Sequence, residues 1–134
     1  MIPNFTIYSD KVKLTANYYI EYLGFNLLYK VEDAENPYVW LEFNNQFLLI
    51  WPWNNKLGIA RPAVFEVADI FEWFFEMQQR TRINVPLFKK DGKYNFSILD
   101  CEDNVILFIE QTSSVVEYSD ELNTMDLALE AKNS

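Results

Sequence analysis

The sequence has no histidine, one cysteine and three glycines among its 134 residues. The absence of histidine excludes Ser-His-Asp and Cys-His catalytic sets and histidine-ligated metal sites, and it removes the usual acid–base group at neutral pH. The single cysteine, Cys101, excludes an internal disulfide and is typical of a reducing compartment, so we expect a cytoplasmic protein. Gly24, Gly58 and Gly92 stand too far apart to form a glycine-rich phosphate loop.

Long apolar runs and positive charge are also scarce. No stretch approaches the roughly 20 apolar residues that a membrane-spanning helix needs, and residues 1–10 lack the basic start and apolar segment of a signal peptide. The sequence has eleven basic and twenty acidic residues, for a net charge of −9. Nucleic acid demands a basic surface, so we expect neither a nucleic-acid nor a membrane partner. The acidic balance suits a cationic ligand, or simply solubility.

What the sequence does contain is apolar and aromatic. Half of the residues are hydrophobic and 17% are aromatic. A chain of this size buries roughly two-thirds of its unfolded surface, which supports a stable core without disulfides. We therefore expect one structural domain.

The first half of the chain alternates turn signals with periodic apolar segments. It predicts a strand over 4–9, a helix over 11–23, and strands over 25–32, 38–43 and 46–51. Asp10 is the expected N-cap of the helix and Gly24 its C-terminal stop. Leu14, Tyr18 and Tyr22 recur every four residues, with Tyr19 and Leu23 beside them, and predict its apolar face.

The second half repeats this order. It predicts a strand over 63–67, a helix over 70–80, a weak edge strand over 85–89, and strands over 93–100 and 105–110. Asp69 with Glu72 forms a variant capping box for the helix. Asp10 and Asp69 stand 59 positions apart. Asn45 and Asn104, which each precede an apolar strand, have the same separation, and this repeat indicates an internal duplication. Neither half can bury both faces of its strands alone, so we expect a shared curved sheet.

Four short segments resemble motifs of the vicinal oxygen chelate superfamily, which includes glyoxalase I, extradiol dioxygenases and bleomycin-resistance proteins. They are residues 18–25 (YYIEYLGF), 38–43 (YVWLEF), 65–70 (FEVADI) and 100–104 (DCEDN). The resemblance covers residues 3–110, although Cys101 and Asp103 replace the usual proline and glycine of the last motif. It implies an α+β fold with two tandem βαβββ modules that form a curved mixed sheet around a U-shaped cleft, with helices on the outer face.

The resemblance also divides the chain. It places the first module at 1–57, the second at 58–110, and an acidic C-terminal extension at 111–134. Residues 111–134 hold five acids and one lysine. Asp120 can cap a short helix that carries Leu122, Met125 and Leu129 on one face, and this segment can lie across the cleft, pack on a partner chain, or stay disordered.

The metal-dependent members of the superfamily carry ligands at one spot on the first and fourth strands of each module. The resemblance aligns these spots with Asn4, Leu48 (or Ile50 in a shifted register), Pro62 and Leu107. Hydrocarbon side chains cannot coordinate a cation, and one amide oxygen is inadequate for a divalent metal. We therefore expect no metal and no cofactor, and we lean against catalysis. A site built from carboxylates, with Glu42, Glu66 and Glu110 as candidates, is the alternative.

Strand alternation predicts which side chains line the cleft. The mixed aromatic and polar faces should line it, and the wholly apolar faces should pack under the helices. The predicted ligand-binding residues are Tyr8, Trp40, Glu42 and Glu66, with Leu48 and Leu107 on the floor and Trp51 and Trp53 on the rim. Such a site suits a flat, partly cationic organic molecule. In the alternative interpretation, the two rim tryptophans are core or dimer contacts.

Three hypotheses for function follow. The first is a metal-independent small-molecule binding protein that resembles the bleomycin-resistance proteins and sequesters a cationic aromatic antibiotic. The second is a lyase, isomerase or dioxygenase of the same fold that uses carboxylates in the cleft. The third is a dimeric interaction module without a small ligand. Phe71, Trp73, Phe74 and Phe75 crowd the second helix on all sides, which favours a homodimer.

Overall fold

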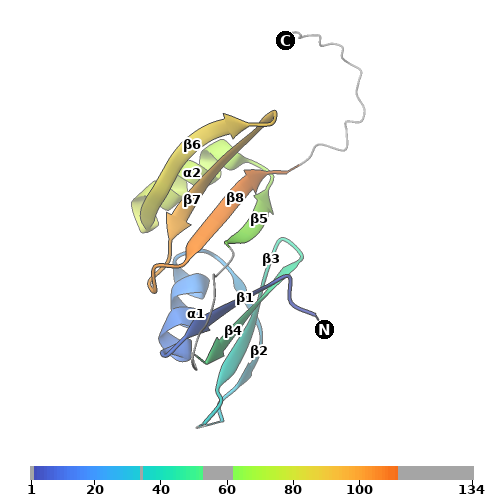
Figure 1. The fold of residues 1–134 in the computed structure, drawn as a ribbon, viewed down its shortest axis with the longest axis vertical. Coiled ribbons are helices and arrows are strands. Elements are labelled where there is room, and N and C mark those ends of the chain that lie inside the picture. Colours follow the sequence, from blue (N-terminus) through green and yellow to red (C-terminus); the bar gives the residue numbers. More distant parts are fainter. Residues whose placement is uncertain (1, 34, 53–61, 112–134) are drawn as a thin grey trace.

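The computed structural model describes residues 2–33, 35–52 and 62–111. The first βαβββ module consists of β1 (Phe5–Ser9), α1 (Val12–Glu21), β2 (Asn26–Val31), β3 (Tyr38–Phe43) and β4 (Gln46–Pro52). The second consists of β5 (Ala63–Val67), α2 (Ile70–Arg80), β6 (Arg82–Lys90), β7 (Lys93–Leu99) and β8 (Val105–Glu110). The predicted α+β class and the tandem βαβββ order are confirmed (Figure 1). No helix in the described ranges is long and apolar enough to cross a membrane.

The strands form two mixed sheets of four, one in each module. Their orders are β1-β4-β3-β2 and β5-β8-β7-β6, with one parallel pair in each sheet. Among the described residues, hydrogen bonds between strands therefore do not join the modules into one continuous sheet. Side chains meet at the junction instead, where the Gln46 amide donates to the Val64 carbonyl and accepts from the Glu66 N–H. Each helix packs on the sheet of its own module, as Figure 1 shows.

Two tight turns connect paired strands through backbone with positive φ. Asn44 and Asn45 have φ of 49° and 65° between β3 and β4, and Asp91 and Gly92 have φ of 53° and 81° between β6 and β7. Asp103 also has a positive φ of 63°. Asparagine and aspartate tolerate this region better than other side chains. These turns fix the register of the strand pairs that follow.

Only one of the two predicted helix caps is correct. The Asp69 carboxylate accepts a hydrogen bond from the Glu72 N–H at 3.2 Å, as the capping pattern predicts. In α1 the N-cap is Lys11, which makes no side-chain cap, so the prediction for Asp10 is wrong. The buried Ser9 hydroxyl instead accepts from the Lys11 N–H at 2.9 Å.

The predicted apolar face of α1 is correct only in part. Tyr19 and Leu23 are fully buried, whereas Leu14 and Tyr22 are 65% and 48% exposed. The face against the sheet is made by Val12, Thr15, Ala16 and Tyr19. Small side chains at the middle of this face allow the helix to approach the sheet closely.

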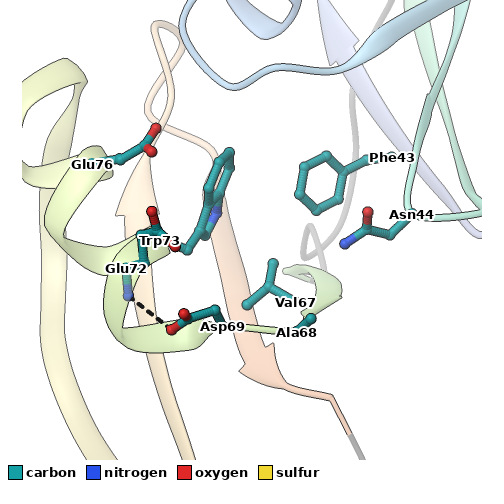
Figure 2. Close-up of a pocket in the computed structure, with 8 residues that line it drawn as sticks. All are labelled: Phe43, Asn44, Val67, Ala68, Asp69, Glu72, Trp73 and Glu76. Atoms are coloured by element: carbon teal, nitrogen blue, oxygen red, sulfur yellow. Dashed lines mark hydrogen bonds between the residues drawn. The ribbon is translucent and has the colours of Figure 1, made fainter.

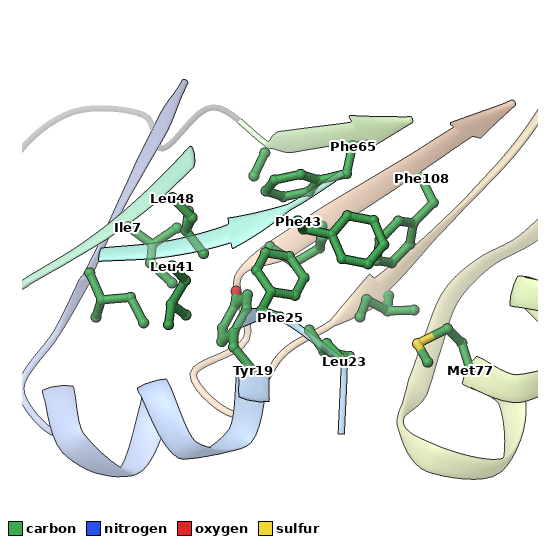
Figure 3. Packing of buried hydrophobic residues seen from close by; sticks show 14 of the residues in the cluster. Ile7, Tyr19, Leu23, Phe25, Leu41, Phe43, Leu48, Phe65, Met77 and Phe108 are labelled. Atoms are coloured by element: carbon green, nitrogen blue, oxygen red, sulfur yellow. The ribbon is translucent and has the colours of Figure 1, made fainter. Parts of the chain in front are cut away.

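A single hydrophobic core extends through both modules. Phe43 of the first module stacks on Phe25 at a centroid distance of 4.8 Å and also meets Phe65 of the second at 5.8 Å. The Phe43 ring also contacts Trp73 and Phe108, both from the second module. Figure 3 shows the rings of Phe25, Phe43, Phe65 and Phe108 between the two sets of strands. The predicted module boundary at 57/58 lies outside the described residues, but the core itself is shared.

Candidate functional site

The face of the first sheet that points away from α1 carries most of the predicted aromatic site. Along β3, Tyr38, Trp40 and Glu42 are half-buried and alternate with buried residues that pack under the helix. Trp40 pairs with Leu49 on β4, and Tyr8 on β1 is in register with Trp51. Paired residues share one face of a sheet, so the structure brings the predicted Tyr8, Trp40 and Trp51 together.

Two further aromatic residues join this surface, which we call the aromatic face: Tyr8, Tyr29, Tyr38, Trp40 and Trp51. Tyr38 stacks on Trp51 with a centroid distance of 5.0 Å and an interplanar angle of 30°. Tyr29 pairs with Trp40 and lies 6.5 Å from the Tyr38 ring. Tyr29, Tyr8 and Trp51 are exposed, so parts of these rings are accessible to a ligand. Tyr38 lies two residues before Trp40 on the same strand, so the two share one face of the sheet. This spacing could have identified Tyr38 as a site residue from the sequence.

Leu48 does not belong to the site, and its prediction is corrected. Its side chain is fully buried, and it pairs with Phe5 and Leu41 on the helix-covered side of the sheet. Ile50, the alternative register, is equally buried. Leu107 lies on the second sheet, half-buried beside Val64. Trp53 lies outside the described residues.

The Glu42 carboxylate stabilises the β3–β4 hairpin through two hydrogen bonds. One carboxylate oxygen accepts from the Asn26 amide at 2.9 Å, and the other accepts from the Asn45 backbone N–H at 2.8 Å. Both hydrogen bonds hold the pKa of Glu42 below its ordinary value, and the bond from Asn26 has the larger effect. Both oxygens already have partners, so Glu42 has a structural role in this conformation.

Glu66 lies on β5, in the other sheet, rather than on the aromatic face. Its side chain is exposed, while its backbone N–H and carbonyl bond to the side chains of Gln46 and Asn44. With these two residues and Gln111 it lines a polar cavity of about 300 Å³. The predicted set of site residues is thus divided between the two modules.

The residues at the superfamily's metal positions do not fit a metal. Asn4 uses its amide oxygen to accept from the Phe47 N–H at 2.6 Å, and the other three positions carry leucine or proline. Within residues 2–33, 35–52 and 62–111, no three carboxylate or thiol side chains are grouped closely enough to hold an ion. We therefore derive no chemistry through a metal.

A cavity that the sequence did not predict lies between the modules (Figure 2). It measures about 310 Å³ and is lined by the Phe43–Asn44 end of β3 and by the N-terminal half of α2. Figure 2 shows Trp73 and Phe43 on opposite sides of it, with Asp69, Glu72 and Glu76 along α2. The indole N–H of Trp73 is buried and has no hydrogen-bond partner among the described residues.

A further cavity of about 460 Å³ runs along α1 and includes Cys101. The Cys101 side chain is exposed at the turn before β8, within 3.8 Å of the Thr15 hydroxyl. Partial desolvation raises the pKa of this thiol. The thiol is therefore protonated at neutral pH, which makes Cys101 a poor nucleophile.

No protein-family model matches the chain, and no curated protein matches it in sequence. Solved structures do match in fold. TioX from Micromonospora sp. ML1 is 16% identical with a TM-score of 0.65, over 80% of this chain and 95% of TioX. A glyoxalase family protein from Enterococcus faecalis is 20% identical with a TM-score of 0.65, over 82% and 97%. A lactoylglutathione lyase from Agrobacterium tumefaciens is 18% identical with a TM-score of 0.63, over 82% and 92%.

Identities at this level establish the fold alone, because one fold carries many activities. The paired βαβββ modules agree with the motifs in residues 18–25, 38–43, 65–70 and 100–104. The chain therefore has the fold of the vicinal oxygen chelate superfamily.

Proposed function

We propose that the protein is a metal-independent small-molecule binding protein whose aromatic face takes up a flat organic molecule. The observation that carries the proposal is the stacked Tyr38–Trp51 pair, which lies on an open sheet face beside Trp40. One similar structure is named a glyoxalase/bleomycin resistance protein/dioxygenase, from Alicyclobacillus acidocaldarius, at 15% identity. A cationic aromatic antibiotic is the ligand class that we infer for this chain.

The aromatic face supplies attraction for such a ligand in two ways. Stacking of aromatic rings contributes about 0.5–1.5 kcal/mol for each pair. A cation over the face of a tryptophan or tyrosine gains roughly 0.5–2 kcal/mol, depending on how far it is desolvated. The net charge of −9 adds long-range attraction for cations. Since Glu42 is committed to the hairpin, recognition of the cation rests on the rings rather than on a carboxylate at this face.

Catalysis by carboxylates is the second candidate, and the lowered pKa of Glu42 makes that residue a weaker base. Glu66, exposed in its polar cavity, is the carboxylate that this alternative would use. The distinguishing observation is the chemical state of the ligand after incubation, because a binding protein returns it unchanged. A dimeric module without a small ligand would show no saturable binding.

The test is a calorimetric titration of metal-stripped protein with cationic aromatic antibiotics, beginning with bleomycin. We expect saturable binding, weakened about threefold to tenfold by Trp51→Ala because one stacking surface is lost. Tyr22→Ala removes another exposed aromatic ring, at the C-cap of α1, and serves as the control, with unchanged affinity.

Absence of binding across the panel, or equal weakening by both substitutions, would contradict the proposal. Recovery of a modified ligand would favour the enzyme. An intrinsic tryptophan fluorescence titration of the unmodified protein is the independent readout, because Trp40 and Trp51 both belong to the aromatic face.

A further inference from the structure

Helix α2 exposes two phenylalanines on the outside of the second module. Phe71 and Phe75 are 53% and 62% exposed and stand one helical turn apart, so they share one face. The Phe71 ring lies 4.8 Å from the ring of Tyr94 on β7, and the Lys89 ammonium lies over the same tyrosine ring at 5.4 Å. These four side chains form one surface, which we call the basic aromatic patch.

Charge is distributed unevenly around α2. Asp69, Glu72 and Glu76 line the cavity that faces the first module in Figure 2, and Glu76 is paired with Arg80 at 3.2 Å. On the other side, the β6–β7 hairpin reads KKDGK over residues 89–93, with three lysines and one aspartate. The basic aromatic patch is therefore an apolar surface with Lys89 on it and two further lysines in the adjoining hairpin, on a chain whose net charge is −9. Its complement in charge is an acidic, amphipathic segment.

The described part of the chain ends beside this patch. The Gln111 N–H donates to the Val67 carbonyl at 2.9 Å, just before α2 begins at Ile70. The preceding residue, Glu110, accepts a hydrogen bond from the Tyr94 N–H at 3.1 Å. The chain thus leaves β8 between the start of α2 and the start of β7, the two elements that carry the rings of the patch.

The sequence that follows has the required complementary pattern. Residues 112–134 hold five acids and one lysine, and the spacing of Leu122, Met125 and Leu129 places them on one face of a helix. We propose that residues 117–130 bind the basic aromatic patch of the same chain, with the three apolar side chains on Phe71 and Phe75 and the acids toward the lysines. This contact is independent of ligand binding to the aromatic face.

Chain connectivity favours binding within one molecule over binding between two. The residues between Gln111 and Leu122 reach roughly 30 Å when extended, enough to place the helix anywhere on the patch. A short tether of this kind raises the effective concentration to the order of millimolar. A second copy must compete with that concentration, so the segment of the same chain is the favoured occupant.

The test is amide hydrogen exchange of the full chain, followed at residues 117–130. We expect exchange at least about tenfold slower than that of a free peptide of the same sequence. Phe75→Ser, and separately Lys89→Glu/Lys90→Glu, should abolish this protection. The charge-swapped combination of Lys89→Glu/Lys90→Glu with Glu121→Lys/Asp126→Lys should restore it, which a merely destabilised fold would not do.

Leu14→Ser and Lys11→Glu/Lys13→Glu are the controls, since they introduce the same polar and acidic residues at exposed positions of α1 and its N-cap and should leave the protection intact. Circular dichroism confirms that each variant folds. Three results would overturn the proposal: exchange as fast as in the free peptide, protection that disappears on dilution and so comes from a second copy, or protection that patch substitutions do not change.

Discussion

Asp100 of the second module is joined to the first through its side chain. Its carboxylate is fully buried, and one oxygen accepts from the Tyr19 hydroxyl of α1 at 2.5 Å. The other oxygen accepts from the backbone N–H groups of Glu102 and Asn104, both at 2.8 Å. A buried carboxylate is tolerated only when its oxygens are hydrogen-bonded, so the loss of one donor should be costly.

Tyr19→Phe removes that donor and should lower the free energy of unfolding by about 1.5–3 kcal/mol, the range for a hydrogen bond to a charged group. Urea denaturation at neutral pH measures the change. Tyr22→Phe is the matched control, because Tyr22 is half-exposed on the same helix and should change stability little. Equal effects of the two substitutions would show that the Tyr19–Asp100 bond contributes nothing.

The same pair predicts a dependence on alkaline pH. Burial, and next the nearby Asp100, raise the pKa of Tyr19 well above its ordinary value of 10.0. The stabilisation is therefore complete below about pH 10 and is lost as pH rises toward the folded pKa, because the unfolded chain releases its proton first. The stability difference between the unmodified protein and Tyr19→Phe should accordingly shrink above pH 10; a difference that grows would contradict it.

Sequence reasoning succeeded for single residues where the physics is local. The positive φ of Asn45 and Asp103 follows from turn chemistry that can be read in the sequence. It failed for Leu48 because residues of both parities in QFLLIW are apolar, so alternation could not show which side the helix covers. The role of Glu42 depends on Asn26, a residue from another strand, and is equally invisible in the sequence.

The two helices show how a repeated pattern can differ in its details. α2 begins with the Asp69 carboxylate bonded to the Glu72 N–H, whereas α1 uses no side-chain cap. Asp10, the counterpart of Asp69 in the repeat, is exposed, and Ser9 before it bonds to the Lys11 N–H instead.

This difference gives a matched pair of substitutions. Asp69→Ala should lower the free energy of unfolding by about 1 kcal/mol, because the Glu72 N–H loses its acceptor. Asp10→Ala should leave stability within about 0.5 kcal/mol of the unmodified protein, as for other surface changes. Thermal and urea denaturation of both variants check the prediction. If Asp10→Ala lowered the free energy of unfolding more than Asp69→Ala, the result would support Asp10 as the N-cap of α1, as predicted from the sequence.

The strands were predicted better than the helix faces. Strands 38–43, 63–67 and 105–110 have the predicted bounds because alternation and turn signals mark both ends. β6 is longer than predicted, at Arg82–Lys90, because an edge strand tolerates Pro86 and the irregular pairing on either side of it. The face of α1 was predicted only in part, with Tyr19 correct, because its other contacts with the sheet use Thr15 and Ala16, which carry little hydrophobic signal.

The two modules depend on each other for their core. Phe25 and Phe43 pack on Phe65, and Phe43 also reaches Trp73 and Phe108, so neither module encloses its aromatic side chains alone. The duplication and its period could be read from the sequence. The open sheet face and the division of the predicted site between two sheets are consequences of this packing. They could not be read from the sequence.

Separation of the modules should therefore unfold both. We expect fragments 1–57 and 58–134, prepared singly, to lack near-ultraviolet circular dichroism and dispersed amide resonances. Each would expose aromatic surface that the other buries, and chains this short rarely enclose a sufficient core. The control is a flexible glycine–serine insertion between residues 57 and 58, which lengthens the connection without removing any core contact. Loop-closure entropy grows slowly with length, so this insertion should lower the free energy of unfolding by only about 1 kcal/mol.

Cooperative unfolding of either isolated fragment would show instead that the shared aromatic cluster is not what makes the two modules one domain.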